Sequence, residues 1–289
     1  MGEININELV SKFPKRPLDA NKGDAGHVLV IAGSLPYTGS AYLASQAALL
    51  SGSGLVTLAA GKSIHPILAA KLTEVMVKIF IETKDGSLSL MAEKDILKFA
   101  ERCDSFLIGP GVSQNAETQG LVRGLVTKLT KPIVLDADGI NAMAGNGELL
   151  KKAKAPVILT PHPGEMARLV GKEVPDIQAD RKGLALAFAN EYNTFLVLKG
   201  HDTVVVSPSG DFYINRTGNP GMATGGTGDV LAGMIASFVG QGLGAFEAAC
   251  LAVYFHGSAG DLAAGEKGVL SLLATDLLRY LPDVLKKLA

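Results

Sequence analysis

The stretch Asn219-Pro-Gly-Met-Ala-Thr-Gly-Gly-Thr-Gly-Asp229 is the part of the sequence on which the predicted fold depends. Its glycines can adopt positive φ angles and let the backbone approach a ligand closely. The apolar run over residues 230–239 predicts a buried helix, so Gly226, Thr227, Gly228 and Asp229 fall at its first turn. Unpaired amide groups and the positive end of the helix dipole meet there, which predicts a binding site for an anion such as phosphate.

Phosphate binding does not explain Asp229, because a carboxylate in that turn repels phosphate at close range. We therefore expect Asp229 to face a second ligand, one whose hydroxyl group needs a base. The alternative is that this stretch is only a glycine-rich connection and that Asp229 is a negative charge that favours the start of a helix.

The run from Gly225 to Asp229 resembles the signature of the ribokinase-like superfamily, in which the loop forms an anion hole and the aspartate is the catalytic base. The longer run from Asn219 is more specific and resembles the ADP- or ATP-dependent NAD(P)H-hydrate dehydratases, which repair hydrated NADH and NADPH. The resemblance implies an α/β fold of three layers, with a mostly parallel sheet, helices on both faces and an antiparallel edge hairpin. It also implies that Asp229 is the catalytic base and contacts the substrate, and that Gly226, Thr227 and Gly228 bind the nucleotide.

Composition bounds the remaining possibilities. The 289 residues are 47% apolar and carry a net charge of −1, which argues against a nucleic-acid or membrane surface held by bulk electrostatics. Cys103 and Cys250 match no metal spacing and are typical of reduced core residues. The N-terminus has no basic and apolar leader, and no run reaches the ~18 apolar residues of a membrane span. We expect a soluble, cytoplasmic protein.

Short apolar runs alternate with helical patterns along the chain, which predicts a parallel sheet. The first two dozen residues are polar and are interpreted as a lead-in, not a core element. With no repeat or linker, residues 1–289 are predicted to form a single domain. The predicted strands are residues 28–32, 55–59, about 74–81, 105–108, 132–135, 156–159 and 194–198, with a hairpin of 203–207 and 211–215. The predicted helices include residues 39–51, 64–72, 116–129, 176–190, 230–239, 246–264 and 275–288.

Five unusual clusters follow predicted strands, where an open α/β sheet forms its binding crevice. They are Gly33-Ser34, Gly109-Pro-Gly111, Asp136-Ala-Asp138, His162-Pro-Gly-Glu165 and Lys199-Gly200. Asp136 and Asp138 could hold metal-bound water or orient a substrate. They could equally cap the helix that follows.

The resemblance assigns ligands to several of these clusters. It implies that His162 contacts the hydrated nicotinamide nucleotide, and that Glu165 lies where related kinases place an acidic residue that helps to organise Mg²⁺. The alternative is that two prolines shape a turn and Glu165 favours a helix start. The residues that the resemblance implies for the nucleotide, ADP or ATP, are Lys199, Gly200, His201, Asp202 and Thr203; those implied to line the substrate through their small size are Ala41 and Gly111.

Other sites are excluded by spacing. A P-loop fails because position 56 is Val, and a Rossmann fingerprint fails because position 231 is Leu. The histidines lack a zinc-binding pair. The resemblance covers about residues 20–285, although Val112-Ser113 stands where many relatives have Leu-Gly. It implies a homo-oligomer, in the family a tetramer, that depends on a separate epimerase or on spontaneous epimerisation. The alternatives are a small-molecule kinase of the same superfamily and a nucleotide sensor without catalysis.

Overall fold

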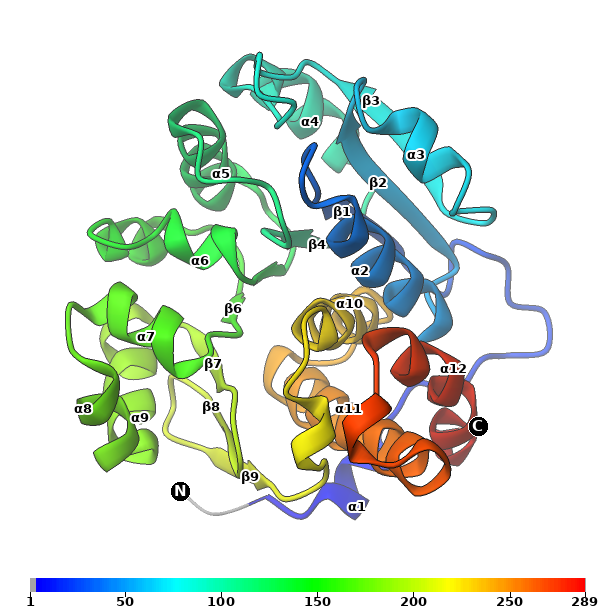
Figure 1. The fold of residues 1–289 in the computed structure, drawn as a ribbon, viewed down its shortest axis with the longest axis vertical. Coiled ribbons are helices and arrows are strands. Elements are labelled where there is room, and N and C mark those ends of the chain that lie inside the picture. The colour runs from blue at the N-terminus through cyan, green and yellow to red at the C-terminus, as the bar shows by residue number, and fades with distance from the viewer. Residues whose placement is uncertain (1–3, 289) are drawn as a thin grey trace.

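The computed structural model describes residues 4–288, in which a nine-stranded sheet lies between two layers of helices (Figure 1). The strand order is β3-β2-β1-β4-β5-β6-β7-β8-β9. The first seven strands are parallel, whereas β8 runs antiparallel to β7, and β9 antiparallel to β8. The strands are β1 (His27–Ile31), β2 (Leu55–Gly61), β3 (Met76–Phe80), β4 (Ser105–Ile108), β5 (Ile133–Leu135), β6 (Val157–Leu159), β7 (Phe195–Leu198), β8 (Thr203–Val206) and β9 (Phe212–Asn215).

Each face of the sheet carries its own hydrophobic core. One layer consists of α1 (Ile6–Val10), α2 (Thr38–Leu50), α3 (His65–Ala69), α10 (Thr227–Gly240), α11 (Ala245–Lys267) and α12 (Ala274–Leu285). The other consists of α4 (Glu93–Ala100), α5 (Ala116–Lys128), α6 (Asp138–Asn141), α7 (Pro163–Val170), α8 (Val174–Ala179) and α9 (Arg181–Tyr192).

Strand β1 shows why the central strands are apolar throughout. Successive side chains of a strand point to opposite faces. Val28 and Val30 accordingly belong to one core, and Leu29 and Ile31 to the other. A strand covered on both faces has no polar side, so a continuous apolar run is its correct sequence signal.

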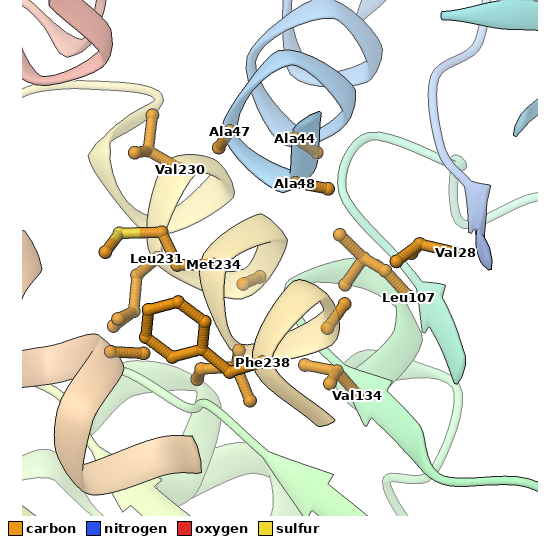
Figure 2. Packing of buried hydrophobic residues seen from close by; sticks show 14 of the residues in the cluster. Val28, Ala44, Ala47, Ala48, Leu107, Val134, Val230, Leu231, Met234 and Phe238 are labelled. Atoms are coloured by element: carbon orange, nitrogen blue, oxygen red, sulfur yellow. The ribbon is translucent and has the colours of Figure 1, made fainter. Parts of the chain in front are cut away.

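Helix α10 lies in the centre of one layer, packed on strands β1, β4 and β5 with α2 on one side and α11 on the other (Figure 2). All of its residues from 230 to 239 are buried. Small residues let α2 approach closely: a Cβ built on Gly233 would lie 2.3 Å from the carbonyl oxygen of Ala44 and 2.9 Å from the Cβ of Ala47. This packing fixes the N-terminus of α10 relative to the ends of the strands.

The predicted strands and the antiparallel edge hairpin are confirmed, with small shifts in their bounds. The interpretation of the N-terminal residues as a lead-in was wrong. Leu9 of α1 is 3% exposed and lies in the core beside α11. The ring of Phe13 meets that of Phe238 edge-on at 5.1 Å. The apolar residues Ile6, Leu9, Val10 and Phe13 have the helical spacing i, i+3, i+4 and i+7, a signal that the polar composition of the segment obscured.

The single helix predicted over residues 176–190 is instead two helices, α8 and α9. The helical conformation is interrupted at Asp180, whose φ and ψ angles are −146° and 72°. Its Oδ1 accepts a hydrogen bond from the amide of Gly183 at 2.9 Å, so Asp180 caps α9. Along residues 4–288, none of the helices combines the length and the hydropathy that crossing a membrane requires.

Candidate functional site

The first turn of α10 presents backbone amides with no side-chain cap. Gly226 precedes the helix in the left-handed region, with a φ angle of 92°, which favours glycine. The Thr227 hydroxyl donates to the carbonyl oxygens of Met222, at 3.0 Å, and Thr224, at 3.1 Å, and so closes the loop. The glycine-rich turn predicted to bind an anion therefore lies at the start of α10, and Thr227 shapes it through its side chain.

Asp229 lies in this turn and has a strongly altered acidity. Burial raises the pKa of Asp229 to about 7, and the nearby Asp136 carboxylate adds to the rise. A hydrogen bond with Ser40 and the positive charge of Lys199 act in the opposite direction. A carboxylate with a pKa near neutrality can both take and release a proton under ordinary conditions, as a general base must.

Asp136 and Lys199 form an ion pair beside the turn. Asp136 ends β5 and is 1% exposed; its Oδ1 accepts from Lys199 Nζ at 2.8 Å and from the Thr160 hydroxyl at 2.7 Å. A Cβ built on Gly228 would lie 3.1 Å from Lys199 Nζ. The ammonium group thus lies at the opening of the anion-binding turn. Burial alone would lower the pKa of Lys199, but the carboxylates of Asp136 and Glu165 raise it, so the group is charged.

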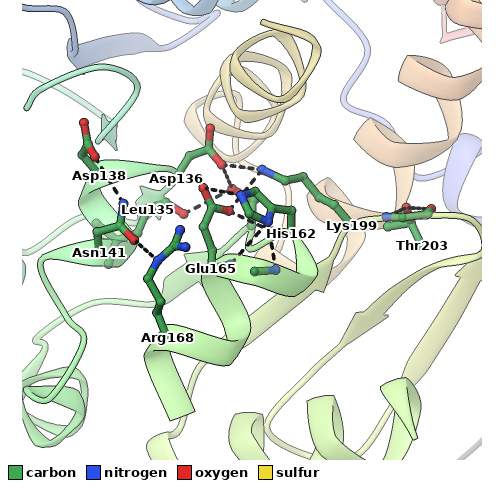
Figure 3. Close-up of polar contacts among 12 residues, drawn as sticks. Leu135, Asp136, Asp138, Asn141, His162, Glu165, Arg168, Lys199 and Thr203 are labelled. Atoms are coloured by element: carbon green, nitrogen blue, oxygen red, sulfur yellow. Dashed lines mark hydrogen bonds and ion pairs between the residues drawn. The ribbon is translucent and has the colours of Figure 1, made fainter. Parts of the chain in front are cut away.

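His162 and Glu165 start helix α7 as a reciprocal pair (Figure 3). His162 Nδ1 accepts from the amides of Gly164, at 3.0 Å, and Glu165, at 3.3 Å, while Glu165 Oε2 accepts from the His162 amide at 2.8 Å. The proton of the neutral ring is therefore assigned to Nε2. Burial lowers the pKa of His162, although Glu165 opposes this. Half of the His162 side chain is exposed, so a ligand can reach the ring, and Nε2 lies 3.5 Å from Glu165 Oε1.

The interpretation of Glu165 as a residue that favours the helix start is thus correct, and His162 caps the same helix, which the sequence did not predict. Neither contact excludes a ligand role. Glu165 is 7% exposed at its side chain, and its Oε2 lies 3.8 Å from Lys199 Nζ. Figure 3 shows His162, Glu165, Asp136 and Lys199 converging at the ends of three neighbouring strands. The sequence rule that placed them at one edge of the sheet is confirmed.

Asp138 does not join this group. Its carboxylate accepts hydrogen bonds from the Ser113 amide at 3.1 Å, the Gln114 side chain at 3.3 Å and the Asn141 side chain at 3.2 Å. Helix α6 has no side-chain cap. The alternative that these aspartates cap the following helix is therefore wrong. Asp136 pairs with Lys199, and Asp138 holds the loop that follows β4.

The segment from Lys199 to Thr203 forms a tight turn between β7 and β8. The Thr203 hydroxyl donates to the Gly200 carbonyl at 2.9 Å, and Gly200 and Asp202 have positive φ angles of 145° and 53°. His201 is almost fully exposed. Lys199 thus lies beside Gly228, at the inner end of the turn, while His201 and Asp202 face solvent at the outer end.

Arg181 fastens this turn and was missed by the sequence reasoning. Its Nη2 donates to the carbonyls of Leu198, at 2.9 Å, and Lys199, at 3.2 Å, and its Nη1 donates to that of His201. Burial lowers the pKa of Arg181. An arginine that follows a helix cap carries no motif, so nothing in the sequence links it to a turn 17 to 20 residues later.

Gly111 lies beside Ser40, which hydrogen bonds to Asp229, and Ala41 follows Ser40 in α2. A Cβ built on Gly111 would meet the Cβ of Tyr37 at 2.5 Å and that of Ser40 at 3.1 Å, and Ser40 bonds Asp229. Ala41 is fully buried and packs against Gly33. Gly111 therefore belongs to the surroundings of Asp229, whereas Ala41 can affect a ligand only through the shape of the loop.

A buried aspartate with a raised pKa in the first turn of a glycine-rich helix start fits several families, and comparison with known proteins distinguishes them. The sequence profile described as NAD(P)H-hydrate dehydratase matches residues 28–283. The chain belongs to the NAD(P)H-hydrate dehydratase family.

Individual NAD(P)H-hydrate dehydratases agree with this assignment. An ADP-dependent (S)-NAD(P)H-hydrate dehydratase of Neisseria meningitidis is 36% identical over 92% of this chain and 86% of its own. A bifunctional NAD(P)H-hydrate repair enzyme of Moorella thermoacetica is 46% identical over 96% of this chain. The chain spans about half the length of the bifunctional relatives that it matches: 52% of the Moorella enzyme and 54% of that of Thermofilum pendens.

Solved structures confirm the fold of the chain. The ADP/ATP-dependent NAD(P)H-hydrate dehydratase of Bacillus subtilis, co-crystallised with ATP/Mg²⁺, is 33% identical, covers 99% of this chain and 98% of its own, and has a TM-score of 0.83. A ribokinase-like superfamily protein of Enterococcus faecalis has a TM-score of 0.84 at 29% identity, over 99% and 96% of the two chains. The predicted three-layer ribokinase-like fold is therefore confirmed.

The carboxylates near Lys199 do not form a closed metal site within the described part of the chain. Among the described residues, no group of three or more His, Cys, Asp or Glu side chains could hold a metal ion. Asp136 and Glu165 supply carboxylate oxygens, which Mg²⁺ prefers, but both lie against Lys199. This arrangement fits Mg²⁺ that is carried by nucleotide phosphates and touches one or two carboxylates, which is how the ion is bound in phosphoryl-transfer sites.

Proposed function

We propose that the chain dehydrates the S form of hydrated NADH and NADPH and couples this reaction to the conversion of ADP to AMP and phosphate. One observation carries the proposal: Asp229, with a pKa near 7, lies in the first turn of α10 beside the Lys199 ammonium. A base and an anion-binding turn in contact are what transfer of a phosphoryl group to a hydroxyl requires. The family assignment supports the identity of that hydroxyl.

The first step is phosphorylation of the hydroxyl on the hydrated nicotinamide ring, because hydroxide is a poor leaving group. The ring oxygen attacks the β-phosphorus of ADP, its proton passes to Asp229, and the bond between that phosphorus and the bridging oxygen breaks to release AMP. The amides of Gly228 and its neighbours and the Lys199 ammonium stabilise the negative charge on the transferred group.

The second step is elimination. The lone pair of the ring nitrogen drives cleavage of the carbon–oxygen bond, whose electrons leave with the phosphate. Loss of a proton from the adjacent ring carbon then restores the double bond of NADH. The products are NADH, AMP and phosphate, which balances the added water of the hydrated ring against the hydrolysis of ADP. No oxidant or reductant is needed.

The two ligands are assigned to the two sides of Asp229. We assign the nucleotide to Gly226, Thr227, Gly228 and the turn from Lys199 to Thr203. Arg181 stabilises this turn through its hydrogen bonds to backbone carbonyl groups. We assign the hydrated nucleotide to His162, which would contact it through Nε2, and to the loops of Gly111 and Ala41. The names of the Neisseria and Bacillus relatives support ADP or ATP as the phosphoryl donor.

Mg²⁺ is proposed to enter with the nucleotide, as the ATP/Mg²⁺ crystals of the Bacillus relative support. Glu165 is the carboxylate that we propose to touch it; the bound ion would neutralise phosphate charge. We further propose a single dehydratase domain over residues 1–289 in a homo-oligomeric, cytoplasmic enzyme that binds neither nucleic acid nor membranes. Light scattering of the purified chain measures the oligomeric state directly.

The experiment that tests the function is recovery of NADH absorbance from purified S-form hydrated NADH, with ADP, with ATP and without nucleotide. We expect recovery with ADP, and one phosphate and one AMP for each NADH. A small-molecule kinase would instead give a stable phosphorylated alcohol, and a sensor would bind without turnover. No recovery with either nucleotide under conditions in which the protein binds ADP would overturn the proposal.

A further inference from the structure

The segment that leads into the anion-binding turn is fastened along helix α11. This segment, residues 217–227, is called the approach loop here; it connects β9 to α10 and runs past α11 in Figure 1. The carboxylate of Asp261 accepts from the amide of Gly218 at 2.9 Å and from the side-chain amide of Asn219 at 3.0 Å. At the other end of the loop, His256 Nε2 lies 2.8 Å from the carbonyl oxygen of Thr227, which can only accept, so the ring donates.

Two glycines of α11 let the loop lie directly on the helix backbone between these contacts. A Cβ built on Gly257 would lie 2.2 Å from the Thr217 hydroxyl oxygen and 2.6 Å from its carbonyl carbon. A Cβ on Gly260 would lie 2.3 Å from the sulfur of Met222. Glycine is less favourable than alanine inside a helix, so two glycines in one turn need a packing reason. The close approach of the loop supplies it.

His256 and Asp261 differ in their surroundings. His256 is 9% exposed, and burial lowers its pKa to about 4, against the effect of its bond to Thr227, so the ring is neutral. Asp261 is exposed, but its two oxygens hold two different donors of adjacent residues. The hydrogen bonds of the two side chains go to the approach loop, and the charge of Lys199 reaches His256 only as a further, weaker cause of its lowered pKa.

We infer that His256 and Asp261 are positioning residues that hold the two ends of the approach loop and thereby aim the amides of the anion-binding turn at the nucleotide. The inference rests on the proposed function for the identity of the nucleotide. The hydrogen bonds of His256 and Asp261 to the approach loop do not depend on the proposed function. Small displacements of groups that bind a reacting phosphate lower rates strongly: about 1 Å can cost about 100-fold.

The direct test uses Asp261→Asn, which folds with little risk because the side chain is exposed. An amide can accept from Gly218, but its NH₂ group would face the NH₂ group of Asn219, so one of the two bonds is lost. Glu266→Gln is the matched control, since it makes the same change on the same helix at an exposed residue. For the buried end, His256→Leu removes the donor, and His256→Gln restores an N–H that can reach Thr227.

Two readouts are measured: amide hydrogen exchange of residues 218–228, and calorimetric affinity for ADP. We expect Asp261→Asn and His256→Leu to speed exchange in this segment and to weaken ADP binding about tenfold or more. We expect Glu266→Gln to match the wild type and His256→Gln to recover most of the loss. In the dehydratase assay, KM for ADP should rise while KM for hydrated NADH stays within about twofold.

Unchanged exchange and ADP affinity in a folded Asp261→Asn protein would overturn the inference, as would a uniform loss of stability with no local change. If the wild type binds ADP but regenerates no NADH, the proposed function fails. The exchange and affinity data still decide whether His256 and Asp261 position the approach loop. If His256→Leu does not fold, the comparison of Asp261→Asn with Glu266→Gln decides alone.

Discussion

Replacing Asp229 by Asn removes the proposed base while keeping the size of the side chain and an acceptor for Ser40. A positioned base contributes about 10²–10⁴-fold to a rate, so kcat should fall by that factor. The pKa of about 7 adds a second signature. The wild-type rate should fall as the pH drops below about 7, because Asp229 then takes up a proton before the substrate arrives. The residual rate of the variant should lack this limb.

The same substitution should stabilise the protein at high pH. Because folding raises the pKa of Asp229 from 3.8 to about 7, its contribution to stability is present below pH 3.8 and is lost as the pH rises through about 7. The full rise sets an upper bound of about 4 kcal/mol, and partial exposure to solvent lowers this to roughly 1–3 kcal/mol. Asn cannot ionise, so the variant avoids the loss.

Steady-state kinetics between about pH 5.5 and 9 and urea unfolding at both ends of that range measure these effects. Calorimetry must show that the variant still binds ADP, so that the loss belongs to chemistry. An Asp229→Asn protein that regenerates NADH near the wild-type rate would refute the reasoning. So would a variant that is less stable than the wild type at pH 9, because Asp229 would then be a helix-stabilising charge.

Three further predictions concern Gly228, His162 and Lys199, the first two with a control variant each. Gly228→Val should weaken ADP binding by crowding Lys199, 3.1 Å from the new Cβ, whereas Gly225→Ala, where a Cβ meets nothing within 4 Å, should not; equal affinities in calorimetry would move the phosphate elsewhere. His162→Ala should raise KM for hydrated NADH with ADP affinity nearly unchanged, and His162→Asn, which keeps a helix cap, separates that effect from the cap. The charge of Lys199 lowers the pKa of Asp229, so Lys199→Met should shift the acid limb of the pH profile to higher pH. An unshifted limb would contradict the electrostatic effect of Lys199 on Asp229.

The anion-binding turn could be predicted from the sequence because its causes are local. Positive φ at Gly226 and the start of a fully apolar helix lie within a few residues of each other. The meeting of His162 and Lys199 could be predicted because parallel strands end at one edge of the sheet, a rule of topology that needs no side-chain detail.

Contacts between distant residues could not be predicted in this way. Asp136 and Lys199 are 63 residues apart, and their pairing depends on strands β5, β6 and β7 being neighbours in register. Arg181 acts on the carbonyls of a turn and has no motif. His256 lies in a helix that reads as ordinary apolar core, and only the approach of the loop gives its ring a function.

The measurement that tests the central claim most directly follows the oxygen atom of the ring hydroxyl. NADH is hydrated in ¹⁸O-labelled water, the S form is purified, and it is turned over with ADP in ordinary water. Transfer of a phosphoryl group to that hydroxyl, followed by elimination, predicts one ¹⁸O atom in each inorganic phosphate released. Unlabelled phosphate, with the ¹⁸O recovered in water, would contradict the account, because the ring hydroxyl would then have left without being phosphorylated.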